Sequence, residues 1–211
     1  MRKFILLSVF LVSGVFNFYA QESEFLVIKK DNLVGLVSST GTEIVTPKYN
    51  AIDEFDLLKK GWAKITLGEK VGYINRAGKE VVTPIYDEIR GFGVYQKDWA
   101  LVSKGGKLGF INTDGKTVIE PIYDQIDLFG RVRKDWAKVS LDGKFGFING
   151  TGGVAVLPKY DDIENFNVYK KNLAVVKLDG KFGLINMDGK ETLAPVYDHL
   201  QPLGSDAKKK K

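Results

Sequence analysis

Hydrophobic and polar side chains alternate along short segments of this chain, most clearly between residues 136 and 160. Residues 136–141 (Trp-Ala-Lys-Val-Ser-Leu) alternate as a half-buried β-strand does. Asp142-Gly143 follows, a pair suited to the positive φ angles of a two-residue hairpin turn, so residues 144–149 are predicted to be the return strand. A third strand is predicted over 154–160, where Pro158 lies late enough to be tolerated near a strand end.

The register of this hairpin determines which side chains share a face. With Asp142-Gly143 as the turn, Val139 faces Gly146 across the two strands. We expect a neighbouring sheet to approach closely at this glycine, and the opposite, aromatic face to bury large side chains. The first face carries Ala137, Val139, Gly146 and Ile148, and the second carries Trp136, Lys138, Phe145 and Phe147.

The whole pattern recurs every 37 residues without an insertion. A fixed period of this size indicates one supersecondary unit that is repeated and stacked. We therefore predict an all-β fold of five antiparallel, three-stranded repeats, with a short fourth strand possible near Ile163. The repeats are 25–61, 62–98, 99–135, 136–172 and 173–205. The residues that keep the step are Pro47, Pro84, Pro121, Pro158 and Pro195, together with the glycine series 35, 72, 109, 146, 183 and 41, 78, 115, 152, 189.

The two end repeats differ from the three inner ones. Phe25 and Leu173 stand where the inner copies have Trp, and Leu203 stands where the other copies have Phe. Divergent end copies are typical of caps on an open stack, which is the arrangement we predict. The alternative is a closed five-bladed β-propeller, because closure needs no caps. Phe25 and Leu203 would be neighbours in a ring and far apart in an open array.

The repeated motifs resemble the WG-repeat (KWG-repeat) family of bacterial proteins over residues 25 to about 203. The matching segments are Gly143-Lys-Phe-Gly-Phe-Ile-Asn149, the Thr/Asp-Gly turn and Pro121-Ile-Tyr-Asp124. The resemblance implies a binding or scaffolding role in the bacterial cell or its envelope, and it provides no shared catalytic residue. The chain departs from the family at the Trp that gives it its name, which is replaced by Val34, Val71, Leu108, Phe145 and Phe182.

The ends of the chain predict export. Arg2-Lys3 precedes a mostly apolar stretch to Phe18, and Ala20 provides a cleavage point, so residues 1–20 are predicted to be a signal peptide. The alternative is a retained N-terminal anchor. We expect a protein of the bacterial periplasm, outer surface or medium, without a membrane span after cleavage, and the absence of cysteine is consistent with this. A short linker (21–24) precedes the repeats, and a basic tail (206–211) follows them.

The net charge of +5 does not indicate a nucleic-acid partner. Six of the 31 basic residues lie at the two ends, and removing them leaves 25 against 26 acidic residues. The body of the chain is thus close to neutral, and the overall charge is a poor guide to partners. Lys208 to Lys211 are predicted to be a solvated tail, with contact to an anionic polymer or membrane as the alternative.

The inventory of reactive side chains disfavours catalysis. There is a single histidine, His199, and there is no cysteine, so no catalytic residue, cofactor or metal is predicted. A polysaccharide hydrolase with an Asp/Glu pair is the least favoured function. One set of acidic residues recurs with the repeat and suggests a metal ladder, but we interpret it as turn caps that accept backbone hydrogen bonds. These residues are Asp87, Asp124, Asp161 and Asp198.

The connectors that precede the Trp positions are the candidate binding site. They combine bulky apolar residues with basic ones, and equivalent loops of a stack lie on one side. We expect this row to bind a protein partner, with an anionic glycan or cell-wall polymer as the alternative. The structural alternative is that the apolar residues tuck under the loops and the lysines are merely solvated. The candidate residues are Lys59, Lys60, Tyr95, Lys97, Arg131, Arg133, Lys134, Tyr169, Lys170 and Lys171.

Overall fold

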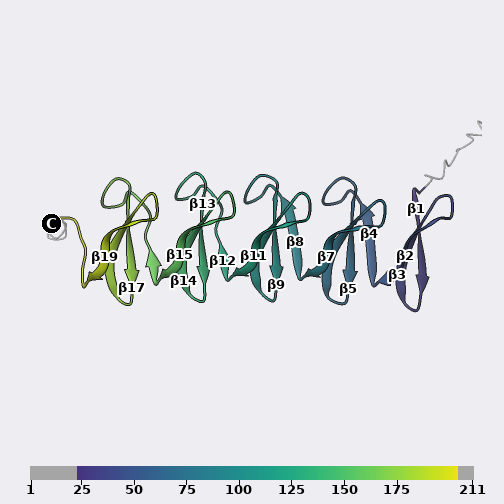
Figure 1. Cartoon of the computed structure of the whole chain (residues 1–211), viewed down its shortest axis with the longest axis horizontal. Helices are drawn as coiled ribbons and strands as arrows, with labels where there is room; N and C mark the ends of the chain where they lie inside the picture. Colours follow the sequence, from purple (N-terminus) through teal and green to yellow (C-terminus); the bar gives the residue numbers. More distant parts are fainter. Residues whose placement is uncertain (1–22, 204–211) are drawn as a thin grey trace, which may run out of the picture.

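The structure is a computed structural model that describes residues 23–203, so the predicted signal peptide (1–20) and the basic tail (206–211) lie outside the described residues. The described part consists of five antiparallel β-sheets in a row, joined by turns and short connectors (Figure 1). No helix within it is long and apolar enough to cross a membrane.

Each sheet is a meander in which neighbouring strands follow one another along the chain. The first sheet has three strands and the other four have four each. The first sheet contains β1 (Phe25–Lys30), β2 (Leu33–Ser38) and β3 (Glu43–Tyr49). The second contains β4 (Ala51–Phe55), β5 (Trp62–Leu67), β6 (Lys70–Asn75) and β7 (Glu80–Tyr86). The third contains β8 (Glu88–Phe92), β9 (Trp99–Lys104), β10 (Lys107–Asn112) and β11 (Thr117–Tyr123). The fourth contains β12 (Gln125–Ile126), β13 (Trp136–Leu141), β14 (Lys144–Asn149) and β15 (Val154–Tyr160), and the fifth contains β16 (Asp162–Ile163), β17 (Leu173–Leu178), β18 (Lys181–Asn186) and β19 (Glu191–Tyr197).

The predicted hairpin register is confirmed. In the fourth sheet Val139 pairs with Gly146 and Leu141 pairs with Lys144. The turn residues Asp142 and Gly143 have φ angles of 50° and 76°, as a two-residue hairpin turn requires. The short fourth strand expected near Ile163 is β16, and it pairs with β17 of the following hairpin. This strand therefore crosses from one repeat to the next and ties adjacent repeats together.

The prediction that a neighbouring sheet approaches closely at Gly146 is wrong. A Cβ atom on Gly146 would lie 2.6 Å from the backbone nitrogen of Pro158, in the third strand of the same sheet. The close approach occurs where β14 and β15 shift register, between Phe147 and Phe145. The second series meets the neighbouring sheet wherever a sheet precedes it. A Cβ on Gly115 would lie 2.9 Å from the carbonyl carbon of Val81, whereas one on Gly41, in the first sheet, would meet nothing within 4 Å.

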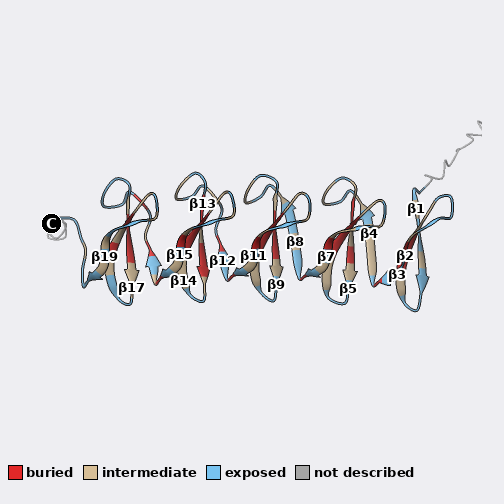
Figure 2. Ribbon diagram, in the orientation of Figure 1, coloured by how far each residue is buried: buried red, intermediate tan, exposed pale blue. Residues whose placement is uncertain are grey.

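The array is open, as predicted, and is not a propeller. β1 and β19 lie at opposite ends of the long axis (Figure 1), and within residues 23–203 the first and last sheets share no strand pairing. Buried residues concentrate in the central strands of each sheet, while the turns on both long edges are mostly exposed (Figure 2).

Adjacent sheets are held together by apolar clusters that repeat along the array. Between the first and second sheets, Tyr49 of β3 packs in one cluster with Ala63 and Ile65 of β5. A Phe at the end of the crossing strand adds an aromatic contact, as Phe92 does at 6.0 Å from Trp62. The repeated Tyr, Trp and Phe positions of this junction therefore serve packing.

Candidate functional site

The meander places all equivalent loops on one of two long edges. Trp62 pairs with Asn75 and Leu67 pairs with Lys70, so the connector before β5 and the turn after β6 lie on the same edge. The hairpin turn between β5 and β6 lies on the other edge (Figure 1). The first is named the connector edge, and comprises the connectors 56–61, 93–98, 130–135 and 167–172 with the turns 39–42, 76–79, 113–116, 150–153 and 187–190. The second is named the hairpin edge, and comprises the hairpin turns 31–32, 68–69, 105–106, 142–143 and 179–180 with the residues around them.

All ten predicted binding residues lie on the connector edge, but not all of them are available to a partner. The half-buried ones are Lys59, Tyr95 and Arg133. The exposed ones are Lys60, Lys97, Arg131, Lys134, Tyr169, Lys170 and Lys171.

The half-buried residues take part in packing. Lys59 Nζ lies 4.7 Å above the Trp62 ring. The Arg133 guanidinium lies 4.8 Å above the Trp136 ring and donates a hydrogen bond to the Met187 carbonyl of the next sheet. The Tyr95 ring packs edge-on at 5.6 Å from Phe110. These three side chains therefore pack under the connectors and support them, and they are not available to a partner.

Four exposed lysines keep the 37-residue step and carry uncompensated charge. In residues 23–203 their side chains make no hydrogen bond and no ion pair. Three exposed apolar side chains, Leu57, Val94 and Val168, stand three residues before them and are 71%, 62% and 59% exposed. Over the whole connector edge, twelve basic side chains stand against five acidic ones. The four lysines are Lys60, Lys97, Lys134 and Lys171.

Four lysines on the hairpin edge, which begin the second strand of each of the last four hairpins, are by contrast paired. Lys107 Nζ lies 2.5 Å from Asp124 Oδ1, and Lys144 Nζ lies 2.5 Å from Asp161 Oδ1. The hydrogen bond from Lys107 holds the pKa of Asp124 below its usual range, and the same contact raises the pKa of Lys107. The corresponding pairs in the second and fifth sheets join Lys70 with Asp87 and Lys181 with Asp198.

The repeated acidic residues also cap turns, but not the turns that follow them directly. Asp87 Oδ2 accepts a hydrogen bond of 2.6 Å from the backbone N–H of Gly105, in the hairpin turn of the next sheet. Asp161 accepts one from Gly180 in the same way. Asp87 and Asp161 thus each link the Lys of their own hairpin to the turn of the next. Among residues 23–203, no three His, Cys, Asp or Glu side chains are placed to hold a metal ion.

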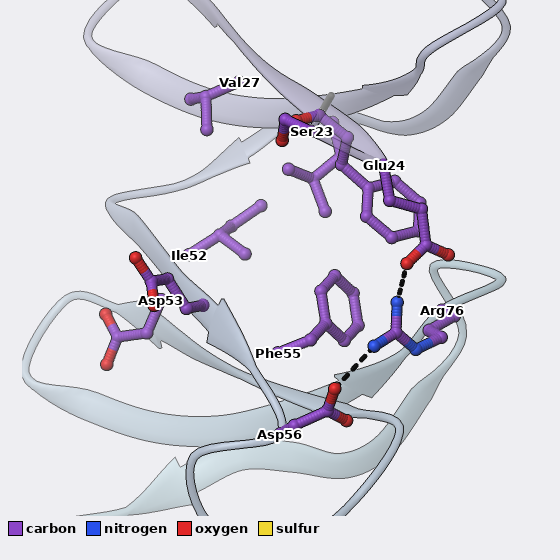
Figure 3. Close-up of a pocket in the computed structure, with 11 residues that line it drawn as sticks. Ser23, Glu24, Val27, Ile52, Asp53, Phe55, Asp56 and Arg76 are labelled. Atoms are coloured by element: carbon purple, nitrogen blue, oxygen red, sulfur yellow. Dashed lines mark hydrogen bonds and ion pairs between the residues drawn. The ribbon is translucent and has the colours of Figure 1, made fainter. Parts of the chain in front are cut away.

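A pocket of about 320 Å³ lies at the N-terminal end, between the first sheet and β4 (Figure 3). Phe25 and Phe55 stack in it with ring centroids 4.9 Å apart. Arg76 reaches across its rim, where it bonds to Glu24, lies 2.6 Å from Asp56 Oδ2, and stacks 4.9 Å over the Phe55 ring. One guanidinium thus binds the carboxylates of both Glu24 and Asp56, and we interpret these ion pairs as contacts that hold the first two sheets together.

This end pocket was not predicted, although the sequence contains its signal. Leu36 lines it and occupies the repeat position at which the three inner copies have Tyr73, Phe110 and Phe147. The last copy has Leu184 there, and a cavity of about 180 Å³ lies beside it. The second sheet keeps a cavity of about 290 Å³ at the matching place beside Tyr73, so the smaller side chain accounts for only part of the space at the ends. The single histidine, His199, lies 2.8 Å from Gln201 Oε1 through its Nε2 atom and lines neither cavity.

Comparison with protein families gives one match, to the family described as WG containing repeat. Its repeat unit matches residues 35–70, 72–107, 109–145, 145–182 and 182–206, most of the chain. No curated protein matches the chain.

Several solved structures align with the chain at low similarity. Apo AztD from Citrobacter koseri is 13% identical over 84% of this chain and 60% of its own, with a TM-score of 0.31. PorZ from Porphyromonas gingivalis is 12% identical over 85% and 27%, with a TM-score of 0.28. Kluyveromyces lactis Hsv2p is 13% identical over 72% and 52%, with a TM-score of 0.30. The chain spans 60% or less of each of these proteins, and at such TM-scores the alignments carry no conclusion about its function.

Proposed function

The chain belongs to the family of WG containing repeats, and from this premise we propose that it is an exported, non-catalytic binding or scaffold protein that holds an acidic protein partner along its connector edge. The observation that carries the proposal is the row of four unpaired lysines, spaced by one repeat and accompanied by exposed apolar side chains.

The chemistry of this edge suits a protein better than a polymer. A row of uncompensated positive charge attracts an acidic surface and speeds encounter. The exposed Leu57, Val94 and Val168 offer apolar area that a protein partner buries, as interface cores do. A carbohydrate partner favours exposed aromatic rings, and of the two connector tyrosines Tyr95 is packed against Phe110 while Tyr169 is exposed.

Charge reversal on the connector edge tests the proposal. The test variant carries Lys60→Glu, Lys97→Glu and Lys134→Glu. The matched control reverses three exposed lysines without ion pairs near the hairpin edge, namely Lys29, Lys30 and Lys104, and changes the net charge equally. Both variants and the native chain are used to capture proteins from envelope extract, with quantification by mass spectrometry.

We expect at least one acidic protein that the native chain and the control capture equally and that the test variant captures about tenfold less. Raising the salt concentration should also weaken this capture, since the contact is electrostatic. Equal recovery by all three chains would exclude the connector edge. A different outcome would indicate an anionic polymer as the ligand instead of a protein. In that case no protein is captured, the native chain is retained on insoluble cell wall, and the test variant is not.

A further inference from the structure

The junction between adjacent sheets is built four times inside this chain from the same parts. The strand that follows each third-strand Tyr leaves its own sheet and pairs with the first strand of the next hairpin, as β4 does with β5. The Tyr itself is covered by that next sheet. Tyr49, Tyr86, Tyr123 and Tyr160 are between 1% and 5% exposed.

At the C-terminal end no further sheet follows the outgoing half of this junction within residues 23–203. Tyr197 holds the same repeat position as the four buried tyrosines but is 47% exposed. The segment 199–203 corresponds to β4, β8, β12 and β16, and it pairs with no hairpin in the described part of the chain. Leu203, at the repeat position of Phe55, is fully exposed.

The N-terminal end presents the incoming half. The first sheet lacks a fourth strand, so the outer edge of β1 is unpaired among the described residues. Leu26 of β1 is 55% exposed, whereas Ala63, Ala100, Ala137 and Ala174 at the same repeat position are 0–1% exposed. An unpaired strand edge flanked by exposed apolar side chains is a template for another strand.

We propose that the two ends dock on each other in different copies of the chain, so that residues 199–203 of one copy become the missing fourth strand of the first sheet of the next. The partner is a second copy because four internal junctions already show this pairing. Ile52 pairs with Ile65 and Phe55 with Ala63, and moving these pairs by whole repeats sets Leu200 against Ile28 and Leu203 against Leu26.

Two details of the sequence fit this register. The first two internal junctions set a large Phe against a small Ala. The ends would set Leu203 against Leu26, so that a side chain smaller than Phe meets one larger than Ala. Pro202 lacks a backbone N–H, but Leu128 and Asn165 at the same repeat position make no backbone hydrogen bond in the structure. In a junction of the shorter kind, whose crossing strand is the two-residue β12 or β16, the proline therefore loses no bond.

Docking of this kind joins the C-terminal end of one copy to the N-terminal end of another, so the two contacting surfaces are different. A head-to-tail contact that does not close into a ring produces an open chain of copies. Because the array is straight and its ends point in opposite directions (Figure 1), each added copy leaves a free head and a free tail. We expect chains that lengthen with protein concentration, and no preferred dimer.

Complementary blocking of the two ends tests the proposal on the purified chain. The variants are Leu26→Glu, which blocks the head, and Leu203→Glu, which blocks the tail. Both residues are exposed, and circular dichroism checks that each variant keeps the native fold. Sedimentation velocity over a hundredfold range of concentration should show growth beyond dimers for the native chain, and monomers for each variant alone. An equimolar mixture of the variants should form a dimer and nothing larger, because it contains one intact head and one intact tail.

A native chain that stays monomeric at every concentration, for example because residues outside the described part cover an end, overturns the proposal. So does a single variant that still associates. A second measurement needs no disruption of the interface. The chain has no cysteine, so the double variant Ile28→Cys and Leu200→Cys should form ladders of disulfide-linked copies on oxidation, whereas Ile28→Cys alone should give dimers at most.

Discussion

Alanine substitutions at two glycines can distinguish the destabilisation caused by close packing between sheets from that caused by backbone strain alone. Gly115 has a φ angle of 78° and Gly143 has one of 76°, so alanine at either position adopts the same unfavourable left-handed conformation. Their surroundings differ. A Cβ on Gly143 meets nothing within 4 Å, while a Cβ on Gly115 lies 2.9 Å from the Val81 carbonyl carbon and closer still to its oxygen.

The magnitude of each effect follows from these contacts. The left-handed conformation costs roughly 1–2 kcal/mol for a residue with a Cβ, and both variants pay it equally. At Gly115 the added atom sits well inside the ordinary carbon–carbon contact of about 3.5–4.0 Å and presses on backbone that cannot rotate away. Overpacking of this kind costs roughly 1–3 kcal/mol more. We therefore expect Gly115→Ala to lower the free energy of unfolding by about 2–5 kcal/mol, and Gly143→Ala by about 1–2 kcal/mol.

Urea unfolding followed by tryptophan fluorescence measures both variants against the native chain. In thermal unfolding, each kcal/mol lowers the melting temperature by about 2–4 °C in a protein of this size. Equal destabilisation of the two variants would refute the reasoning, because it would mean that the neighbouring sheet does not lie against Gly115. Greater destabilisation by Gly143→Ala would refute it as well.

Three further predictions concern the contacts between repeats and the end pocket. Because the hydrogen bond from Lys107 lowers the pKa of Asp124, the stabilisation that this aspartate provides is present above the ordinary Asp pKa of about 3.9 and is lost as pH falls through its lowered value. Melting temperatures measured from pH 7 to 2 should therefore fall less steeply for Asp124→Asn, and an unchanged slope would contradict this. Tyr160→Phe removes a 2.7 Å hydrogen bond to Glu191 and should lower the free energy of unfolding by about 1–2 kcal/mol, whereas Tyr86→Phe removes a 3.3 Å contact with a threonine and should cost under about 1 kcal/mol; urea titrations compare the two, and equal losses would contradict the assignment. Leu36→Phe should fill the end pocket and raise the free energy of unfolding by about 0.5–2 kcal/mol, measured by the same titration, while a lower stability would mean that the pocket cannot admit a ring.

The local parts of the fold were predictable because they depend on neighbours in sequence. Asp142-Gly143 specifies a tight turn, and once the turn is fixed the alternation of residues sets the register of the whole hairpin. The repeat itself was also predictable, since the proline and glycine steps leave no other period. The period alone does not define where one structural unit ends and the next begins. A 37-residue repeat can be divided anywhere, so the sequence did not reveal that the strand near Ile163 belongs to the following sheet.

The contacts between repeats were harder to predict because they are not local. Gly146 and Gly115 keep the same step, and composition alone does not distinguish the glycine that faces its own third strand from the one that faces the next sheet. The repeated aspartates were predicted to cap turns, but which turn Asp87 caps did not follow from the sequence, since its partner Gly105 is 18 residues away. Within the candidate site, sequence reasoning found the row but did not separate Arg133, which is packed on Trp136, from the solvated Lys134 beside it.

The charged residues of the two edges differ in their contacts. On the hairpin edge Lys70, Lys107 and Lys144 are each held by an aspartate, and Asp87 and Asp161 also accept a hydrogen bond from the turn of the next hairpin. These charges therefore belong to the contacts between nearest neighbours that stabilise a repeat array. On the connector edge Lys60, Lys97, Lys134 and Lys171 make no such contacts. Their spacing therefore comes from the repeat, but their charge is not needed to hold the repeats together. Reversal of Lys97 should consequently leave stability unchanged where reversal of Lys107 lowers it, and this difference allows binding along the connector edge to be altered without unfolding the array.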